Sequence, residues 1–123
     1  MRVLWACCIT LALTTGAYAK MGLSFEWGPT QKCFDPKSPP MSLSGVPKDT
    51  ESLDIRMVDL DATGYPHGGG KVAYQGRKSL AYGAFTYKGP CPPRPHRYQF
   101  TAKAIDASGK VLATATARRK FPE

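Results

Sequence analysis

The sequence predicts an all-β protein, an antiparallel β-sandwich or partly open barrel that folds as a single domain. Its length of 123 residues fits one domain. Apolar and polar residues alternate along several segments, as in half-buried strands, and stretches rich in Gly and Pro separate these segments. No stretch after residue 19 keeps helical spacing. We therefore expect little or no helix in the folded domain.

The first 19 residues have the pattern of a secretory signal peptide. Arg2 is followed by an apolar run over residues 3–15 and by Ala17-Tyr18-Ala19, which fits the small-x-small cleavage site. The run is shorter than the roughly 20 residues that a membrane-spanning helix needs. We expect cleavage near Ala19 and a mature domain of residues 20–123 that is periplasmic or secreted. A lipoprotein signal ending at Cys7 is disfavoured, because this cysteine precedes a full hydrophobic region.

The chain is basic, with a formal net charge of +8 at pH 7, and Arg2 would leave with the signal peptide. Such a charge favours anionic partners such as phosphates or acidic lipid surfaces, although it is also common in soluble proteins whose lysines only face water. The basic residues are scattered, and Arg118-Arg119-Lys120 is the only run. No basic helix, basic-aromatic alternation or zinc spacing supports nucleic-acid binding. We therefore expect no nucleic-acid partner.

Two cysteines, Cys33 and Cys91, remain after the loss of Cys7 and Cys8 with the signal peptide. An even pair in an exported chain predicts a disulfide, since the compartments outside the cytoplasm are oxidising. The alternative is a pair of buried free thiols. A metal site on two cysteines would need a matching histidine cluster, which the sequence lacks. We expect neither a metal nor another cofactor.

In the first half of the domain the apolar pattern predicts three strands. Residues 23–27 are a candidate edge strand, and residues 41–46 are a second strand that closes in a turn at 47–50. The best-defined segment is 52–61, where apolar residues occupy both faces, so we expect a central strand covered on both sides. Residues 28–40 are rich in Pro, Gly and Lys and are predicted to form a loop.

The second half begins with a predicted loop at 64–70, which holds four glycines. Two strands are then expected around a turn near Gly76, and the four prolines of residues 89–95 predict a rigid irregular segment. The clearest alternation lies in two further strands joined by a tight turn at Gly109. These four expected strands cover residues 71–75, 83–88, 97–106 and 110–118.

Candidate chemistry is limited to two aspartates and two histidines. Asp59 and Asp61 lie two apart at a strand end, so we expect both to project from the same face. Such a pair could act as general acid and base, but at a strand end it more often caps backbone amides. His67 and His96 match neither a hydrolase triad with a nucleophile elbow nor a metal-ligand spacing. We therefore expect no catalytic residues and no enzyme activity.

Four motifs follow one another in a specific order. They are Ser38-Pro39-Pro40, Asp59-Leu60-Asp61-Ala62, Gly89-Pro90-Cys91-Pro92-Pro93 and His96-Arg97-Tyr98. In this order the sequence resembles the phosphatidylethanolamine-binding protein (PEBP) family, also called the Raf kinase inhibitor-like family, in its short bacterial exported form. The resemblance runs from about Cys33 to about Asp106.

The resemblance implies two antiparallel sheets with a small anion pocket at one end. Carried over residue by residue, the ligand-binding positions are Asp59, Asp61, His67, Gly89, Pro90, His96 and Tyr98. The sequence departs from the family pattern where Leu60 and Thr63 replace prolines of the first motif and where Gly68 replaces a usual tryptophan. The span between His67 and Gly89 is also shorter than usual, which would open the pocket.

In such a pocket His96 and Tyr98 would donate hydrogen bonds to an anion, and backbone amides near Gly89 could approach it. Asp59 would either orient His96 and favour its charged form, or receive an ammonium group such as that of ethanolamine. The resemblance thus implies an exported, non-catalytic protein that recognises a phosphate or phospholipid headgroup. Two alternatives remain open: a protein-interaction module or inhibitor of a kinase-like or protease-like partner, and a small hydrolase using His96 and Asp59.

Overall fold

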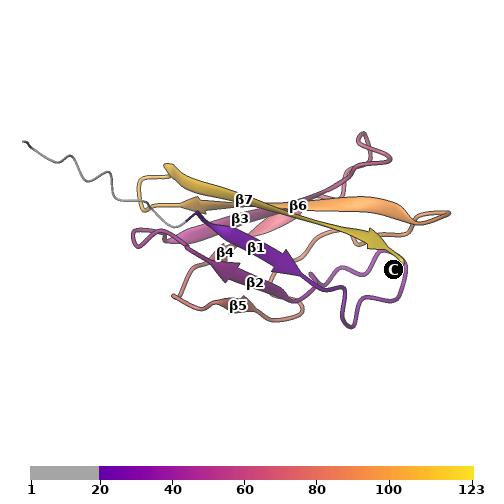
Figure 1. Cartoon of the computed structure of the whole chain (residues 1–123), viewed down its shortest axis with the longest axis horizontal. Helices are drawn as coiled ribbons and strands as arrows, with labels where there is room; N and C mark the ends of the chain where they lie inside the picture. Colours follow the sequence, from indigo (N-terminus) through magenta and orange to yellow (C-terminus); the bar gives the residue numbers. More distant parts are fainter. Residues whose placement is uncertain (1–19) are drawn as a thin grey trace, which may run out of the picture.

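The computed structural model describes residues 20–123, so the predicted signal peptide lies outside the described residues. The described chain forms seven β-strands and no helix (Figure 1). The strands are β1 (Gly22–Phe25), β2 (Met41–Ser44), β3 (Ser52–Asp59), β4 (Gly69–Ala73), β5 (Ser79–Leu80), β6 (His96–Ile105) and β7 (Val111–Phe121). Residues 20–123 accordingly contain no helix of the length and apolarity needed to cross a membrane.

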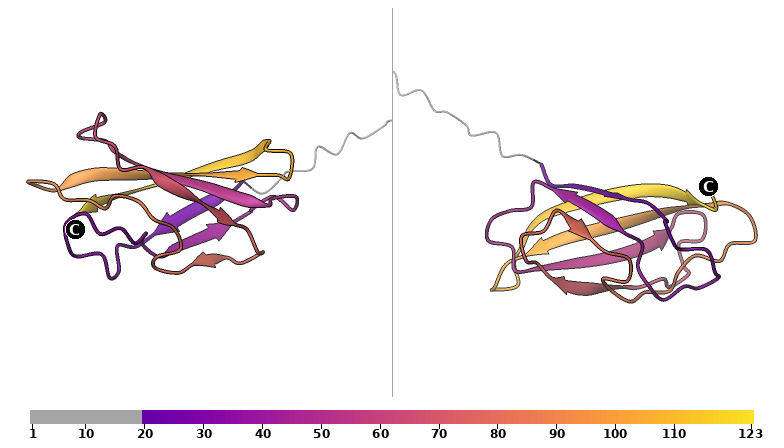
Figure 2. Two further views of the ribbon diagram at one scale, coloured as in Figure 1. Left: turned by 180° about the vertical axis from the view of Figure 1, so that it is seen from behind. Right: turned by 90° about the horizontal axis from the view of Figure 1, so that it is seen from below.

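The strands form two antiparallel sheets that pack face to face as a sandwich (Figure 2). One sheet has the order β1-β2-β5, and the other has the order β4-β3-β6-β7. Aromatic side chains join the two layers: the rings of Phe25 on β1 and Phe100 on β6 meet edge to face, with centroids 4.9 Å apart. The predicted all-β sandwich is thus confirmed for the described part of the chain.

The core forms because apolar residues occupy every second position of β3 and β6, and successive side chains of a strand point to opposite faces. The inward residues of the two strands are register partners and are nearly or fully buried: Leu53, Ile55 and Met57 on β3, and Ala104, Ala102 and Phe100 on β6. Burial of a side chain such as Leu53 contributes roughly 1.5–3 kcal/mol. These two central strands therefore hold the rest of the sheet in place.

The hairpin between β6 and β7 follows the predicted pattern closely. The Asp106 carboxylate accepts hydrogen bonds from the backbone N–H groups of Ser108 and Lys110 and from the Ser108 hydroxyl. Gly109 adopts a φ of 86°, a left-handed conformation that costs glycine little. The bonds from Ser108 and Lys110 hold the pKa of the Asp106 carboxyl below its usual value. Asp106 is therefore a structural acid that closes this turn.

Strand β3 is central in its sheet, but it is not covered on both sides. Its inward face is buried, whereas Val58 on the opposite face is 40% exposed and Arg56 is exposed. The three-stranded sheet packs on the inward face. The apolar residues at 58 and 60 therefore mark a half-exposed strand end and not a second buried face.

The expected strand at residues 83–88 does not form. The other strand expected beside Gly76, at 71–75, is present as β4 and pairs with β3. Phe85 and Tyr87 are buried, so the alternation is real. The segment bonds instead to the loop before β2: Ser38 N–H donates to the Phe85 carbonyl and Tyr87 N–H to the Pro36 carbonyl. This loop contains prolines, which lack an N–H, so it supports only an isolated bridge between Lys37 and Thr86.

The predicted disulfide between Cys33 and Cys91 is present, with Cα atoms 4.6 Å apart. It joins the loop after β1 to the proline-rich segment before β6, across a sequence separation of 58 residues. Closing a loop of this length stabilises a fold by roughly 4 kcal/mol in the chain-entropy model. The bridge also fixes two segments that lie beside the candidate site.

Candidate functional site

The candidate site lies at the end of the sandwich where β3 ends and β6 begins, towards the C-terminus in Figure 1. Asp59, the last residue of β3, is the register partner of Tyr98 near the start of β6. Both side chains face inward and are buried, with exposed fractions of 4% and 1%. The alternation that builds the core thus places the Asp59 carboxylate and the Tyr98 phenol in the interior, at the open end of the sandwich, which is opposite the β6–β7 hairpin.

Asp59 forms a hydrogen-bonded pair with His96. The Nδ1–H group of His96 donates to Oδ2 of Asp59 at 2.7 Å, and both side chains are largely buried. The other carboxylate oxygen, Oδ1, accepts the backbone N–H of Asp61 at 2.9 Å. Asp59 is therefore held rigidly, and it fixes the orientation of the imidazole. The bond uses Nδ1 of His96 and leaves the Nε2 atom for another partner.

Tyr98 completes the floor of the site. Burial raises the pKa of the Tyr98 hydroxyl well above its usual value, and the negative charge of nearby Asp59 raises it further. The phenol therefore stays protonated across the physiological pH range. A protonated phenol can donate a hydrogen bond to an anion.

These residues border a cavity of about 230 Å³. Its lining combines a polar floor with aromatic and proline walls: Phe34, Asp59, Ala62, Tyr65, His67, Cys91, Pro92, Pro93, His96 and Tyr98. Four of the seven positions that the family resemblance implies, namely Asp59, His67, His96 and Tyr98, are thereby brought together. The other three lie outside this lining.

His67 belongs to the wall of the cavity and is buried. Its Nδ1–H group donates to the Lys88 carbonyl at 2.6 Å, and the Lys88 backbone N–H donates to the His67 carbonyl at 2.8 Å. The His67 ring also contacts Tyr98 edge to face, with centroids 5.6 Å apart. The reciprocal bonds place this histidine firmly beside the site, although Gly68 follows it where the family pattern has a tryptophan.

Asp61 points away from the cavity, so the expectation that both aspartates project from one face is wrong. Strand β3 ends at Asp59, and a turn follows in which Ala62 N–H donates to the Asp59 carbonyl. The Asp61 carboxylate instead binds Arg97, through the backbone N–H at 2.7 Å and the guanidinium at 3.1 Å. These bonds from Arg97 hold the pKa of the Asp61 carboxyl below its usual value.

Gly89 and Pro90 lie behind the cavity wall. The Gly89 N–H donates to the Asp35 carbonyl at 3.1 Å, so it is already used inside the protein. A Cβ atom at position 89 would lie 2.5 Å from that carbonyl oxygen. Only glycine permits this approach of two backbone segments. Its structural contribution is to place Cys91, Pro92 and Pro93, which form part of the wall.

Two wall residues, Phe34 and Tyr65, were not singled out from the sequence. Both are partly exposed, at 44% and 37%, and their rings stack with centroids 6.3 Å apart. The Lys88 ammonium lies 4.7 Å from the Phe34 centroid and 4.8 Å from that of Tyr65, within cation–π range. Phe34 has a φ of 54°, an uncommon conformation for a residue with a side chain. Its position next to Cys33 is the one signal that the sequence offered.

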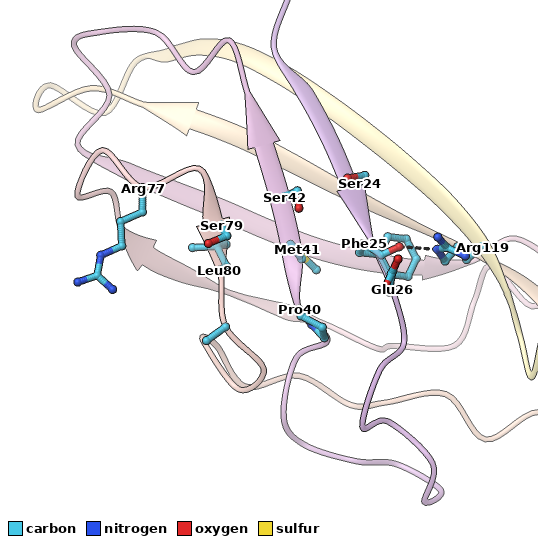
Figure 3. Close-up of a pocket in the computed structure, with 11 residues that line it drawn as sticks. Ser24, Phe25, Glu26, Pro40, Met41, Ser42, Arg77, Ser79, Leu80 and Arg119 are labelled. Atoms are coloured by element: carbon cyan, nitrogen blue, oxygen red, sulfur yellow. Dashed lines mark hydrogen bonds between the residues drawn. The ribbon is translucent and has the colours of Figure 1, made fainter.

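A second, larger hollow of about 460 Å³ lies over the β1-β2-β5 sheet (Figure 3). Ser24, Ser42 and Ser79 are register partners on its surface, and Arg77 and Arg119 lie on opposite sides of it. The Arg119 guanidinium donates to the Phe25 carbonyl and so ties the two sheets together. This hollow contains none of the predicted site residues and no imidazole, so the Asp59–His96 cavity is the candidate site.

Within residues 20–123 no three His, Cys, Asp or Glu side chains are grouped as a metal-binding cluster would require. The Asp59–His96 cavity itself presents a buried carboxylate–imidazole pair, a phenol and aromatic walls.

No protein-family model matches the chain, and no curated protein matches it in sequence. Solved structures do match its fold, and two of them are described here. One is a Chlamydia trachomatis protein described as a PEBP homologue, with 21% identity and a TM-score of 0.63 over 85% of this chain and 98% of the other. The second is Escherichia coli YbcL, described as a member of the mammalian PEBP family, with 19% identity and a TM-score of 0.63 over 84% of this chain and 98% of the other. The chain therefore has the fold of the phosphatidylethanolamine-binding protein family, as its sequence motifs imply.

Proposed function

We propose that residues 20–123 are an exported, non-catalytic binding protein of the PEBP type that recognises a phosphate-bearing group in the Asp59–His96 cavity. The ligand class is phosphate or a phospholipid headgroup. The observation that carries the proposal is the buried 2.7 Å bond between Asp59 and His96, which commits one imidazole nitrogen and leaves the other beside a cavity.

Recognition would depend on two donors at the floor of the cavity. With Nδ1–H bound to Asp59, a protonated His96 has one further N–H group, at Nε2, to donate to a phosphate oxygen. The Tyr98 hydroxyl keeps its proton and borders the same cavity, and turning this proton from Asp59 to the ligand would supply a second donor. Hydrogen bonds between a charged donor and an anion are about twice as strong as neutral ones. A carboxylate beside an anion site is tolerable in this proposal because a protonated His96, bound to Asp59, would offset its negative charge.

The size of the cavity favours a headgroup over a whole lipid. Its volume of about 230 Å³ is below the roughly 300–1,000 Å³ of sites for drug-sized molecules. The partly exposed rings of Phe34 and Tyr65 border the cavity and would contact the part of the ligand that extends outward. The lining contains no Ser or Thr hydroxyl, and its only cysteine is in the disulfide. A Ser, Thr or Cys nucleophile is therefore absent from this lining.

The exposed Phe34 and Tyr65 rings also favour a second candidate function, the docking of a protein partner. Aromatic residues that are exposed side by side are typical of interaction surfaces. In this case partner binding would depend on Phe34 and Tyr65 and would be indifferent to His96.

The test is a titration of residues 20–123 with phosphate, phosphoethanolamine and phosphocholine, followed by ¹H–¹⁵N NMR. We expect shifts at Ala62, His96 and Tyr98 that disappear in His96→Ala and persist in Lys78→Ala, which removes an exposed charge elsewhere. Tighter binding of phosphoethanolamine than of phosphate would indicate that an ammonium group is also read. The absence of shifts at millimolar ligand would refute headgroup recognition and leave partner docking as the leading function.

A further inference from the structure

The outer face of the four-stranded sheet, which faces away from the core, carries a concentration of positive charge. We define it by the outward positions of β3, β4, β6 and β7. Six exposed basic side chains lie on it: Arg56, Lys71, Arg97, Lys103, Arg118 and Lys120. Even after its two acids are counted, this face carries more than half of the net positive charge of residues 20–123.

The strand register gathers these residues from distant parts of the sequence. Lys71 on β4 pairs with Asp54 on β3, which pairs with Lys103 on β6. At the other end of the face, Arg97 on β6 pairs with Lys120 on β7. Because side chains alternate between faces, Arg118 and Lys120 point outward. Arg119 between them points inward, where it donates to the Phe25 carbonyl.

Among residues 20–123, only two acids form salt bridges with these six basic residues. The Asp54 carboxylate binds Arg56 at 3.0 Å, and the Asp61 carboxylate binds Arg97 at 3.1 Å. The other four basic residues, Lys71, Lys103, Arg118 and Lys120, form no salt bridge within residues 20–123. The nearest polar contact of Arg118 is to the neutral Gln99 amide at 2.7 Å. The face therefore keeps a clear positive excess.

We propose that the outer face docks on the surface of an anionic lipid bilayer. This inference is independent of the ligand cavity, because it concerns other residues on the opposite side of the sheet. The charges are spread over four neighbouring strands in two dimensions, which matches a planar array of headgroups better than a single phosphate backbone. The exposed Val58 side chain lies among them and offers a small apolar contact.

The composition of the face disfavours nucleic acid as the occupant. Single-stranded nucleic acids bind through basic grooves that also present aromatic rings for base stacking. The outward positions of these four strands hold basic residues, Thr, Gln, Ser, Ala, Gly, Val, Ile and one Asp, with no Phe, Tyr or Trp. Attraction to an anionic bilayer needs only cations near the surface, each contributing about fivefold to the affinity.

The experiment is vesicle co-sedimentation of oxidised residues 20–123 with liposomes of phosphatidylcholine alone or mixed with phosphatidylglycerol. We expect binding to the anionic liposomes only, weakened by salt because screening shortens the reach of surface charges. The triple variant Lys103→Gln, Arg118→Gln and Lys120→Gln should lose roughly a hundredfold in affinity. The control variant Lys32→Gln, Lys48→Gln and Lys78→Gln removes the same charge from exposed loop positions outside this face and should lose much less.

Equal losses in the two triple variants would overturn the proposal, since net charge alone would then explain the binding. Equal binding to neutral liposomes would overturn it as well. Competition by single-stranded DNA or by heparin that exceeds competition by anionic liposomes would assign the face to a linear polyanion instead. The triple variant Lys103→Gln, Arg118→Gln and Lys120→Gln should keep the NMR shifts that phosphate induces at the cavity, because none of these residues lines it. Failure of the headgroup site and failure of this docking face are therefore distinguishable.

Discussion

An aspartate lies beside each end of β6, and the two aspartates have different partners. Asp106 directly follows β6, whereas Asp59 ends β3 and is the register partner of Tyr98 near the start of β6. At the hairpin end, Asp106 binds only donors of its own turn. At the open end, Asp59 binds one backbone amide and one imidazole that borders a cavity. The comparison shows that a carboxylate satisfied by backbone amides is structural, whereas one that orients a second titratable side chain prepares a site.

The largest expected effect comes from removing the Cys33–Cys91 disulfide, which lies at the cavity end of the sandwich. The double variant Cys33→Ser and Cys91→Ser should lower the free energy of unfolding by about 4 kcal/mol, because the loop of 58 residues is no longer closed. Urea unfolding of wild type under oxidising conditions provides the comparison. An unchanged unfolding midpoint would show that the disulfide adds nothing to the stability of this end.

The next effect concerns the buried pair. Asp59→Ala should destabilise the protein by about 3 kcal/mol, since it removes one partner of a buried pair and leaves the His96 ring without its acceptor. The variant should also lose phosphate binding. Thermal unfolding together with the NMR titration measures both effects. Retention of phosphate shifts by a folded Asp59→Ala protein would contradict the orienting role.

A smaller change tests the second donor of the cavity. Tyr98→Phe keeps the buried ring and removes only the hydroxyl, so it should leave the fold intact and weaken phosphate binding about tenfold, as for a hydrogen bond to a charged group. The matched control is Tyr74→Phe, which removes a hydroxyl on another strand-flanking segment. Equal affinities of Tyr98→Phe and wild type would remove Tyr98 from the site.

The smallest effect is expected at the hairpin end and depends on pH. The bonds from Ser108 and Lys110 depress the pKa of Asp106 in the folded state, so its contribution to stability is present above the unfolded value of 3.8 and is lost as the pH falls through the lower folded value. Asp106→Ala should therefore lower Tm slightly at pH 7. The difference from wild type should vanish in strong acid. A difference that stays constant with pH would contradict this linkage.

Much of the fold could be predicted because period-two alternation and turn residues are local signals. Residues 97–106 and 110–118 were expected as strands and appear as β6 and β7, and the cysteine pairing was correct. The prediction of a strand at 83–88 was wrong. The alternation there reflects the burial of Phe85 and Tyr87, but a strand also needs a neighbouring segment with free N–H groups. The pattern within one segment does not show that its neighbour in the fold contains prolines.

The site could be predicted only in part, for a related reason. Motif order brought Asp59, His67, His96 and Tyr98 to notice, and the structure places all four around one cavity. Asp61 was misplaced because the same-face argument assumed that the strand continues beyond residue 59. Phe34 was missed because its contribution depends on a left-handed backbone conformation and on a contact with Tyr65. No spacing rule reports either of these features.

Because side chains alternate between the two faces of β7, the positions of residues 118–120 in the strand decide which of them face outward. Arg118 and Lys120 contribute to the positive outer face, while Arg119 reaches inward to the Phe25 carbonyl. Replacing any one of the three changes only the contacts of that side chain, which for Arg119 are the Phe25 carbonyl and the Glu123 carboxylate. Deleting one residue from the preceding part of β7 would exchange the two sides, burying two cations and exposing one. This strand should therefore accept point substitutions far more readily than insertions or deletions. Single-residue deletions along β7 would show where its register with β6 is fixed.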